Sequence, residues 1–314
     1  MDVFLLGLNT VIPILIMMVA GYILKTIGII NDQMNVDMSR LYNMLLLPCA
    51  LFVNGYTSDV RGNINFRLVL FGIAGAVIYA VIGRMLFPPK EGDKQRFAYN
   101  HAIYRANIAL FGLAVAESMY PDADLSNMVL YIALVAIVMA ILCEVQLARY
   151  GGKQMNMADI LKKVVTSPMV IASLSGLVFS IIRLPIPGMI LKPLTTIGKA
   201  ATPIGFITLG ASLKLSETKK YLKPLTLFVV LRQIVAPALF LAAGCGLMGF
   251  RGLDTVFIIA LLGCPPAVVT FAIAKAHQDV IDADLAGQMV AFTTLLAVFT
   301  MLILIIGSSA AGIL

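Results

Sequence analysis

Two short stretches hold the residues whose types and spacing suit the binding of an anion. In "YRANIALFG", Arg105 and Asn107 lie two positions apart inside an apolar run. An arginine can grip a carboxylate with two parallel hydrogen bonds, and an asparagine amide offers two donors and one acceptor. In "GCPPAVVTFAIAK", Pro265 and Pro266 are expected to interrupt a helix, because proline lacks the backbone donor and clashes with the preceding turn. Both stretches therefore predict broken helices that expose polar groups.

The surrounding chain has the composition of an integral membrane protein. Of its 314 residues 60% are hydrophobic and 12% are charged, and the mean hydropathy is +0.96. In hydrocarbon a broken helix is tolerated only where it is buried in protein or lines a wet cavity. The net charge of +7 does not indicate nucleic acid, because the basic residues fall in short loops between apolar segments. The four cysteines lie singly in apolar stretches and are expected to be small buried side chains.

Apolar windows of about twenty residues predict the transmembrane spans. Ten windows are found, at 3–25, 36–56, 66–87, 97–119, 125–148, 166–184, 190–213, 224–248, 253–275 and 284–307. The second, fourth, seventh and ninth contain proline, glycine, asparagine or arginine and are expected to be broken. Pro48, Pro203 and Gly210 are the expected structural breaks in the second and seventh spans. The fold class predicted is therefore an all-α membrane protein with ten transmembrane helices.

The basic residues of the loops predict the orientation of the chain. Odd-numbered loops hold fifteen lysines and arginines, and even-numbered loops hold six. By the positive-inside rule the odd loops lie in the cytoplasm, so both termini lie on the extracellular or periplasmic side of the cytoplasmic (inner) membrane. The first apolar run lacks a basic start and a cleavage site, so we interpret it as a retained span and not as a signal peptide.

The two halves of the chain, 1–149 and 164–314, echo each other across a polar cytoplasmic linker at 150–163. Four pairs are separated by 155 positions: Pro13 and Pro168, Gly21 and Gly176, Pro48 and Pro203, and Gly55 and Gly210. Because five spans per half is an odd number, the halves must insert with opposite orientation. Inverted repeats with broken helices at matching positions are typical of secondary transporters. We expect the fourth and ninth spans to cross near the membrane midplane, where helix N-termini offer positive partial charge to an anion.

Five motifs in order resemble those of the auxin efflux carrier family, which includes the plant PIN-formed exporters. They are "LYNMLLLPCALFVNGYTSD" in the second span, "NIALFG" in the fourth, "PIGFITLGASL" in the seventh, "LRQIVAP" in the eighth and "PPAVVTFAIAKAH" in the ninth. The resemblance places Pro48, Asn107, Gly112, Arg232, Pro237, Pro265 and Lys275 at family positions. The chain departs from the family pattern at Ala114, where proline is frequent, at Glu117, where plant exporters have lysine, and at Arg105.

The resemblance implies a ten-span, five-plus-five inverted-repeat fold like that of the sodium/proton antiporters and bile-acid symporters. Spans 1, 2, 6 and 7 would form a scaffold that usually makes a homodimer. Spans 3–5 and 8–10 would form a transport unit that moves against the scaffold in an elevator mechanism. Many bacterial relatives are described as permeases for malate, malonate or similar carboxylates, so the resemblance implies a small organic anion as substrate.

Asn107 and Arg105 each admit more than one interpretation. Asn107 is either a ligand of the substrate carboxylate or a local partner of the unwound backbone. Arg105 lies nine residues beyond Arg96, roughly 13 Å along a helix, and an arginine at that depth must face an anion, a partner or water. It binds a second carboxylate of the substrate, snorkels to the cytoplasmic side, or pairs with Glu144.

Further polar or break-forming residues complete the candidate site. The other substrate-binding candidates are Gly112, Pro265, Pro266, Val268, Asn54, Thr202 and Thr270. Candidates for proton or ion coupling are Glu117, and Lys25 with Asp59, which match a charged pair of plant members; ordinary hydrated charges are the alternative. Arg232 is expected to make a structural pair rather than to contact substrate. His101 and His277 are expected at the membrane interfaces.

The sequence therefore predicts a secondary active transporter for a small organic anion, either a malate- or malonate-type carboxylate or an auxin-like acid. Proton and sodium coupling both stay open. A cation antiporter of the same fold is the alternative, but it would need buried aspartate at the crossing, where the chain has Asn107 and two prolines. Motifs of a membrane enzyme, such as HExxH and GxSxG, are absent. We expect no cofactor, no metal and no nucleic-acid partner.

Overall fold

The computed structural model describes residues 3–58, 64–88, 90, 92–112, 115–116, 119–120, 123, 126–150, 157–213 and 225–314. Within these residues every regular element is a helix, and the β-type pairing is limited to an isolated bridge between Ala106 and Pro266. The prediction of an all-helical protein is confirmed.

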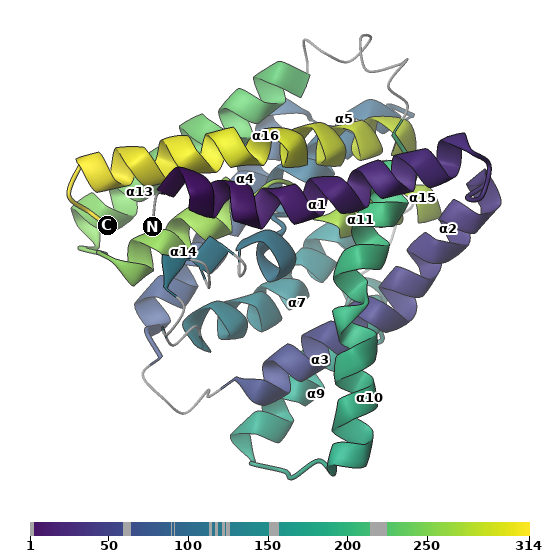
Figure 1. Cartoon of the computed structure of the whole chain (residues 1–314), viewed down its shortest axis with the longest axis horizontal. Helices are drawn as coiled ribbons and strands as arrows, with labels where there is room; N and C mark the ends of the chain where they lie inside the picture. The colour runs from purple at the N-terminus through teal and green to yellow at the C-terminus, as the bar shows by residue number, and fades with distance from the viewer. Residues whose placement is uncertain are drawn as a thin grey trace.

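The helices of the first half follow the predicted spans to within a few residues (Figure 1). They are α1 (Val3–Thr26), α2 (Asp32–Leu41), the π-helical turn η1 (Tyr42–Leu46), α3 (Leu47–Thr57), α4 (Phe66–Leu86), α5 (Lys94–Tyr104), the π-helical turn η2 (Ile108–Gly112) and α7 (Ser126–Tyr150). The fourth predicted span is divided at residues 105–107, between α5 and η2.

The helices of the second half also lie at the predicted spans. They are α9 (Pro168–Ile181), α10 (Gly188–Lys199), α11 (Ala201–Ala211), the π-helical turn η3 (Val230–Val235), α13 (Ala236–Leu247), α14 (Leu253–Gly263), α15 (Val268–Ala276) and α16 (Ala283–Ala310). The seventh predicted span is divided at Ala200, and the ninth at residues 264–267. An additional helix, α8 (Met157–Val165), lies mostly within the predicted linker, where the sequence analysis expected none.

Four helical stretches of the described residues are long and apolar enough to cross a bilayer. They are Asp32–Thr57, Phe66–Leu86, Asn127–Leu147 and Leu225–Leu247. A fifth is formed by Ala283–Ala297 with Phe299–Ala310, if these two helices, bent by 44° at their junction, count as one span. The ten-span arrangement with its five-plus-five repeat stays a prediction.

The surface and the interior both have the character of a membrane protein. Large apolar side chains are exposed outside, with Met85 76%, Met189 83% and Leu247 84% accessible, a surface that suits lipid contact and not water. Inside, every residue of α14 from Thr255 to Gly263 is buried. A helix that is apolar on all sides is covered by protein on all sides. The end of α14 is therefore held in the protein interior.

Two helix pairs, α1 with α11 and α3 with α9, touch backbone to backbone at glycines. A Cβ at Gly21 would lie 2.0 Å from the carbonyl oxygen of Ile207, and a Cβ at Gly176 would lie 2.3 Å from that of Phe52. Ile207 and Phe52 are themselves 155 positions apart, the same offset that relates Gly21 to Gly176. Residues that are related by this offset thus make the same contact. In Figure 1, α3 also packs beside α10, and α1 runs along α16.

Three expected break points lie within described helices. Pro48 follows η1 in the first turn of α3, and the π-helical turn shifts the hydrogen bonding around the missing proline donor. Pro203 lies in the first turn of α11, where a helix has no use for its N–H, and the division comes earlier, at Ala200. Gly210 lies in the last turn of α11 and permits close packing, because a Cβ there would be 1.9 Å from the Met18 carbonyl oxygen. The structure differs from the prediction at these positions.

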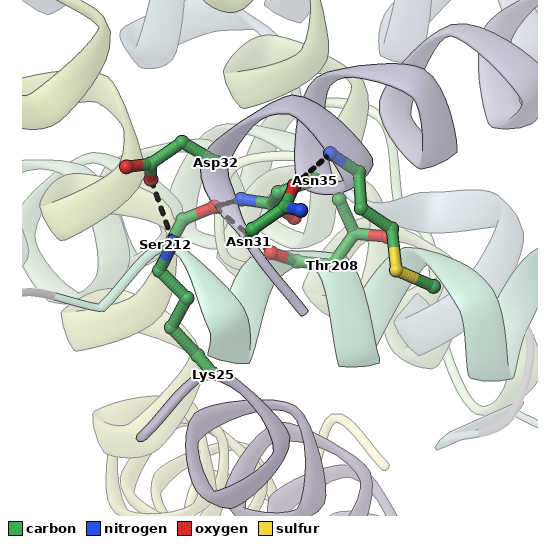
Figure 2. Close-up of polar contacts among 7 residues, drawn as sticks. Lys25, Asn31, Asp32, Asn35, Thr208 and Ser212 are labelled. Atoms are coloured by element: carbon green, nitrogen blue, oxygen red, sulfur yellow. Dashed lines mark hydrogen bonds and ion pairs between the residues drawn. The ribbon is translucent and has the colours of Figure 1, made fainter. Parts of the chain in front are cut away.

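Side chains join α2 to the end of α11. Figure 2 shows the Asn35 amide donating to the Ser212 hydroxyl at 2.6 Å, and that hydroxyl donating to the Thr208 carbonyl oxygen at 2.9 Å. Asn31 caps α2 by accepting from the backbone N–H of Met34 at 2.8 Å. The start of the second predicted span is therefore attached to the end of the seventh.

Candidate functional site

The two divided helices meet at their breaks. The Asn107 N–H donates to the Pro265 carbonyl oxygen at 2.8 Å, and the Ala267 N–H donates to the Arg105 carbonyl oxygen at 2.8 Å. These bonds flank the bridge between Ala106 and Pro266. We call residues 105–107 and 264–267 the crossover. Segments more than 150 residues apart in the chain are thus in direct backbone contact.

The crossover explains the pair of prolines inside an apolar segment. Helix α14 ends at Gly263 and α15 begins at Val268, so Pro265 and Pro266 lie in the extended connection between them. No helical N–H is required there, and the Pro265 carbonyl oxygen is used as an acceptor. Proline is placed where its missing donor costs least and where it ends α14 cleanly.

Two buried polar side chains at the crossover lack hydrogen-bond partners among the described residues. Asn107 is 4% exposed and its Nδ2 atom is unpartnered; Thr270, in the first turn of α15, is 0% exposed and its hydroxyl is unpartnered. Buried polar groups are normally hydrogen-bonded, and leaving one unpaired costs about 1–3 kcal/mol. The first N–H groups of α15 also lack partners within their own helix. These groups can satisfy a small polar ligand.

A cavity of about 510 Å³ lies beside the crossover, with Arg105 in its wall. This volume is within the usual range for small-molecule sites. Its polar and charged lining residues include Ser39, Arg40, Asn43, Arg105, Glu144, Thr166, Ser167, Lys275 and His277. Three permanent cations face one carboxylate, so the cavity attracts anions.

The sequence analysis did not identify Arg40 and Asn43 as site candidates. They belong to a regular stripe on one face of α2 and η1, made of Val36, Ser39, Arg40, Asn43 and Met44. A matching stripe on α7 consists of Ala140, Cys143, Glu144 and Leu147. Polar side chains spaced three and four residues apart in an apolar span share a helix face, and this spacing was the available signal.

His101 is part of a polar cluster that is buried within the protein. It is fully buried in α5; its Nδ1 lies 3.0 Å from the Tyr104 hydroxyl and 3.4 Å from the Gln146 side-chain oxygen. Gln146 of α7 also donates to Asn100 at 2.5 Å. The position of His101 relative to the membrane interface stays a prediction. His277, partly exposed, lines the cavity.

Arg232 makes a structural contact with the end of α14, just before the crossover residues 264–267. It is 1% exposed, and its Nη1 atom donates to the Leu262 carbonyl oxygen in the last turn of α14. The Tyr79 hydroxyl donates to the same oxygen at 3.1 Å, and the guanidinium carbon lies 4.5 Å from the centre of the Tyr79 ring. Arg232 therefore contacts the backbone that precedes the break.

The remaining predicted residues are spread over the structure. Val268 is buried in the first turn of α15, and a Cβ at Gly112 would lie 3.2 Å from the Cys264 sulfur, so both belong to the crossover region. Asn54 in α3 and Thr202 in α11 are half-buried and do not line the cavity. Glu117 lies outside the described residues. The four cysteines are buried, as predicted.

Lys25 was expected to pair with Asp59, but its ion pair in the structure is with Asp32. Lys25 forms an ion pair with Asp32 at 2.7 Å, across the turn between α1 and α2 (Figure 2). The Asp32 side chain is 93% exposed, so this is a surface pair. Asp59 lies outside the described residues.

Comparison with known proteins identifies the family of the chain. The family model described as "Membrane transport protein" matches residues 6–305. The chain is 24% identical over 306 residues to an uncharacterized transporter of Methanothermobacter thermautotrophicus, covering 95% of this chain and 97% of that protein. It is 22% identical over 303 residues to an uncharacterized transporter of Methanocaldococcus jannaschii, covering 92% and 95%. The chain therefore belongs to the membrane transport protein family of the auxin efflux carriers, and it is a transporter and not an enzyme.

Proposed function

We propose that the protein is a secondary active carrier for a small organic anion, a malate- or malonate-type carboxylate or an auxin-like acid. The observation that carries the proposal is the crossover, where the side chains of Asn107 and of Thr270, in the first turn of α15, are buried and have no partner among the described residues. The N-terminal end of a helix carries positive partial charge, which favours a carboxylate. An amide donor from Asn107 would complete the binding of one carboxylate.

In this proposal the adjoining cavity, whose lining includes Arg105 but neither Asn107 nor Thr270, is the route by which an anion reaches the site. Arg105 belongs to the crossover through its backbone and to the cavity through its side chain. Arg40 and Lys275 add positive charge to the same wall. Under the topology predicted by the loop charges, the ends of α2 and α15 that line the cavity lie toward the cytoplasm. The conformation described would then be the inward-facing one.

The reciprocal glycine contacts support the proposed repeat. They pair spans 1 with 7 and 2 with 6, which would form the scaffold in a ten-span fold. In this proposal spans 3–5 and 8–10 move the crossover past the scaffold in an elevator step. A homodimer through the scaffold stays a prediction, and proton and sodium stay the candidates for the coupling ion. A cation antiporter is disfavoured because neither segment of the crossover contains a carboxylate.

Uptake by proteoliposomes tests the proposal. We would measure entry of labelled malate, malonate and indole-3-acetate while proton and sodium gradients are imposed separately. At least one acid should enter against its gradient when one ion gradient is applied. Uptake of none of the three under either gradient would contradict the proposal.

Asn107→Ala tests the site itself. A hydrogen bond to a charged group contributes about 1.5–3 kcal/mol, so the apparent affinity for the transported acid should fall roughly 10- to 150-fold. The matched control is Asn54→Ala, which removes a half-buried amide of α3 outside the crossover and should leave the affinity unchanged. Equal effects of the two substitutions would place the site elsewhere.

A further inference from the structure

Two helices, α5 and α14, have their C-terminal, carbonyl-bearing ends at the crossover. Each of these ends has an arginine. Arg105 is the C-terminal capping residue of α5 and is 8% exposed. Arg232 comes from a different helix, yet it donates to the Leu262 carbonyl oxygen one residue before the end of α14. The last four carbonyl groups of a helix have no partner within it, and Arg232 and the Tyr79 hydroxyl are the two donors to this one.

The environment of Arg232 is costly for a charge. The side chain is 1% exposed, and its Nε and Nη2 atoms have no hydrogen-bond partner in the part of the chain that the structure describes. Burial of a cation costs several kcal/mol unless nearby groups compensate it. The compensating groups in the structure are the Leu262 carbonyl and the face of the Tyr79 ring, 4.5 Å away. A neutral donor would satisfy the carbonyl without that cost, which suggests that the positive charge itself has a use.

That use follows from the helix dipoles. The carbonyl end of a helix carries about half a negative charge, and the amide end about half a positive charge. At the break of the ninth predicted span, only four residues separate the negative end of α14 from the positive end of α15. An anion bound at α15 would be repelled by the end of α14. A guanidinium at Leu262 cancels this repulsion, and the low dielectric of the interior makes the effect larger than in water.

We propose that Arg232 determines the charge preference of the crossover by neutralising the carbonyl end of α14. With Arg105 at the end of α5 and Arg232 at the end of α14, the amide end of α15 stays uncompensated, next to the unpartnered Asn107 and Thr270 side chains. The inference rests on the proposed function, because it concerns the selectivity of that same site. Arg232 acts through the backbone of α14 and is a positioning and selectivity residue without direct contact with substrate.

Three substitutions separate charge from hydrogen bonding. Arg232→Gln keeps a donor for Leu262 and removes the charge, Arg232→Lys keeps the charge, and Tyr79→Phe removes the second donor to the same oxygen and keeps the ring. Dissociation constants of the purified proteins would be measured by calorimetry for the acid that the wild type binds among malate, malonate and indole-3-acetate. Hydrogen exchange of a peptide covering residues 260–270 would report the order of the crossover in the absence of ligand.

Arg232→Gln should weaken binding about tenfold, which corresponds to about 1.4 kcal/mol and is within the effect of a partly buried charge at a helix end. Arg232→Lys and Tyr79→Phe should stay within about threefold of the wild type. Hydrogen exchange of Arg232→Gln should be close to that of the wild type, because the donor is kept. Weak binding with an ordered crossover is a result that a merely structural role would not produce.

Wild-type affinity in Arg232→Gln would overturn the inference and leave the proposed function standing. An equal loss in Arg232→Lys and Arg232→Gln would overturn it as well, because charge would not be the cause. If Arg232→Gln does not fold, Arg232→Lys decides: affinity within threefold supports the inference, and a tenfold loss overturns it. Absence of binding of all three acids by the wild type would count against the proposed function and this inference together.

Discussion

Replacement of Arg105 by glutamine tests the chemistry of the cavity most directly. The side chain is 8% exposed and lines the cavity beside the crossover, so a carboxylate bound to it would be poorly screened by water. Glutamine keeps one donor but removes the charge and the second parallel hydrogen bond. A hydrogen bond to a charged group contributes about 1.5–3 kcal/mol, so the expected loss of affinity is roughly 10- to 150-fold.

The loss should depend on the number of carboxylates in the substrate. If Arg105 grips the second carboxylate, Arg105→Gln weakens the uptake of malate and spares that of lactate, which has a single carboxylate. The assay is the concentration dependence of uptake of both acids in proteoliposomes. Arg84→Gln, which removes an exposed charge in the last turn of α4, is the matched control and should change neither. An equal loss for both acids, or for neither, would refute the reasoning.

Two further substitutions test the packing and the surface pair. Gly210→Ala should lower the apparent unfolding temperature in detergent, by a destabilisation of about 1–3 kcal/mol, because the new Cβ would lie 1.9 Å from the Met18 carbonyl oxygen. Gly246→Ala, with nothing within 4 Å of the added Cβ, is the control, and an equal effect of both would contradict the close contact. Lys25→Ala should change stability by less than about 1 kcal/mol and leave the ion dependence of uptake intact, because the Asp32 side chain of its ion pair is 93% exposed. Loss of ion dependence in this variant would instead assign Lys25 to coupling.

Local sequence patterns were sufficient to predict the helical class and the place of nearly every helix. Hydropathy is a local property, and runs of about twenty apolar residues must be helical in a bilayer, because no water is present to pair the backbone. Proline chemistry likewise located the division between α14 and α15, since Pro265 and Pro266 cannot continue a helix. The helix α8 was missed because it lies in a segment whose composition is polar.

The division of the seventh span was placed less accurately. The sequence analysis assigned it to Pro203 and Gly210, whereas the structure divides the span at Ala200. Proline is compatible with the first turn of a helix, and glycine with close packing, so neither residue type by itself marks a break.

Which distant groups meet depends on how the helices pack together. The hydrogen bond from Asn107 to Pro265 and the contact of Arg232 with Leu262 join residues of different helices, and a local pattern holds no information on such partners. The same is true of the cavity, whose cations come from α2, the crossover and α15. The periodicity of the sequence shows which face of a helix is polar. Which other helix that face contacts is decided by the packing of all helices together. For this reason the residues of the site could be proposed from the sequence, while their common electrostatic environment could not.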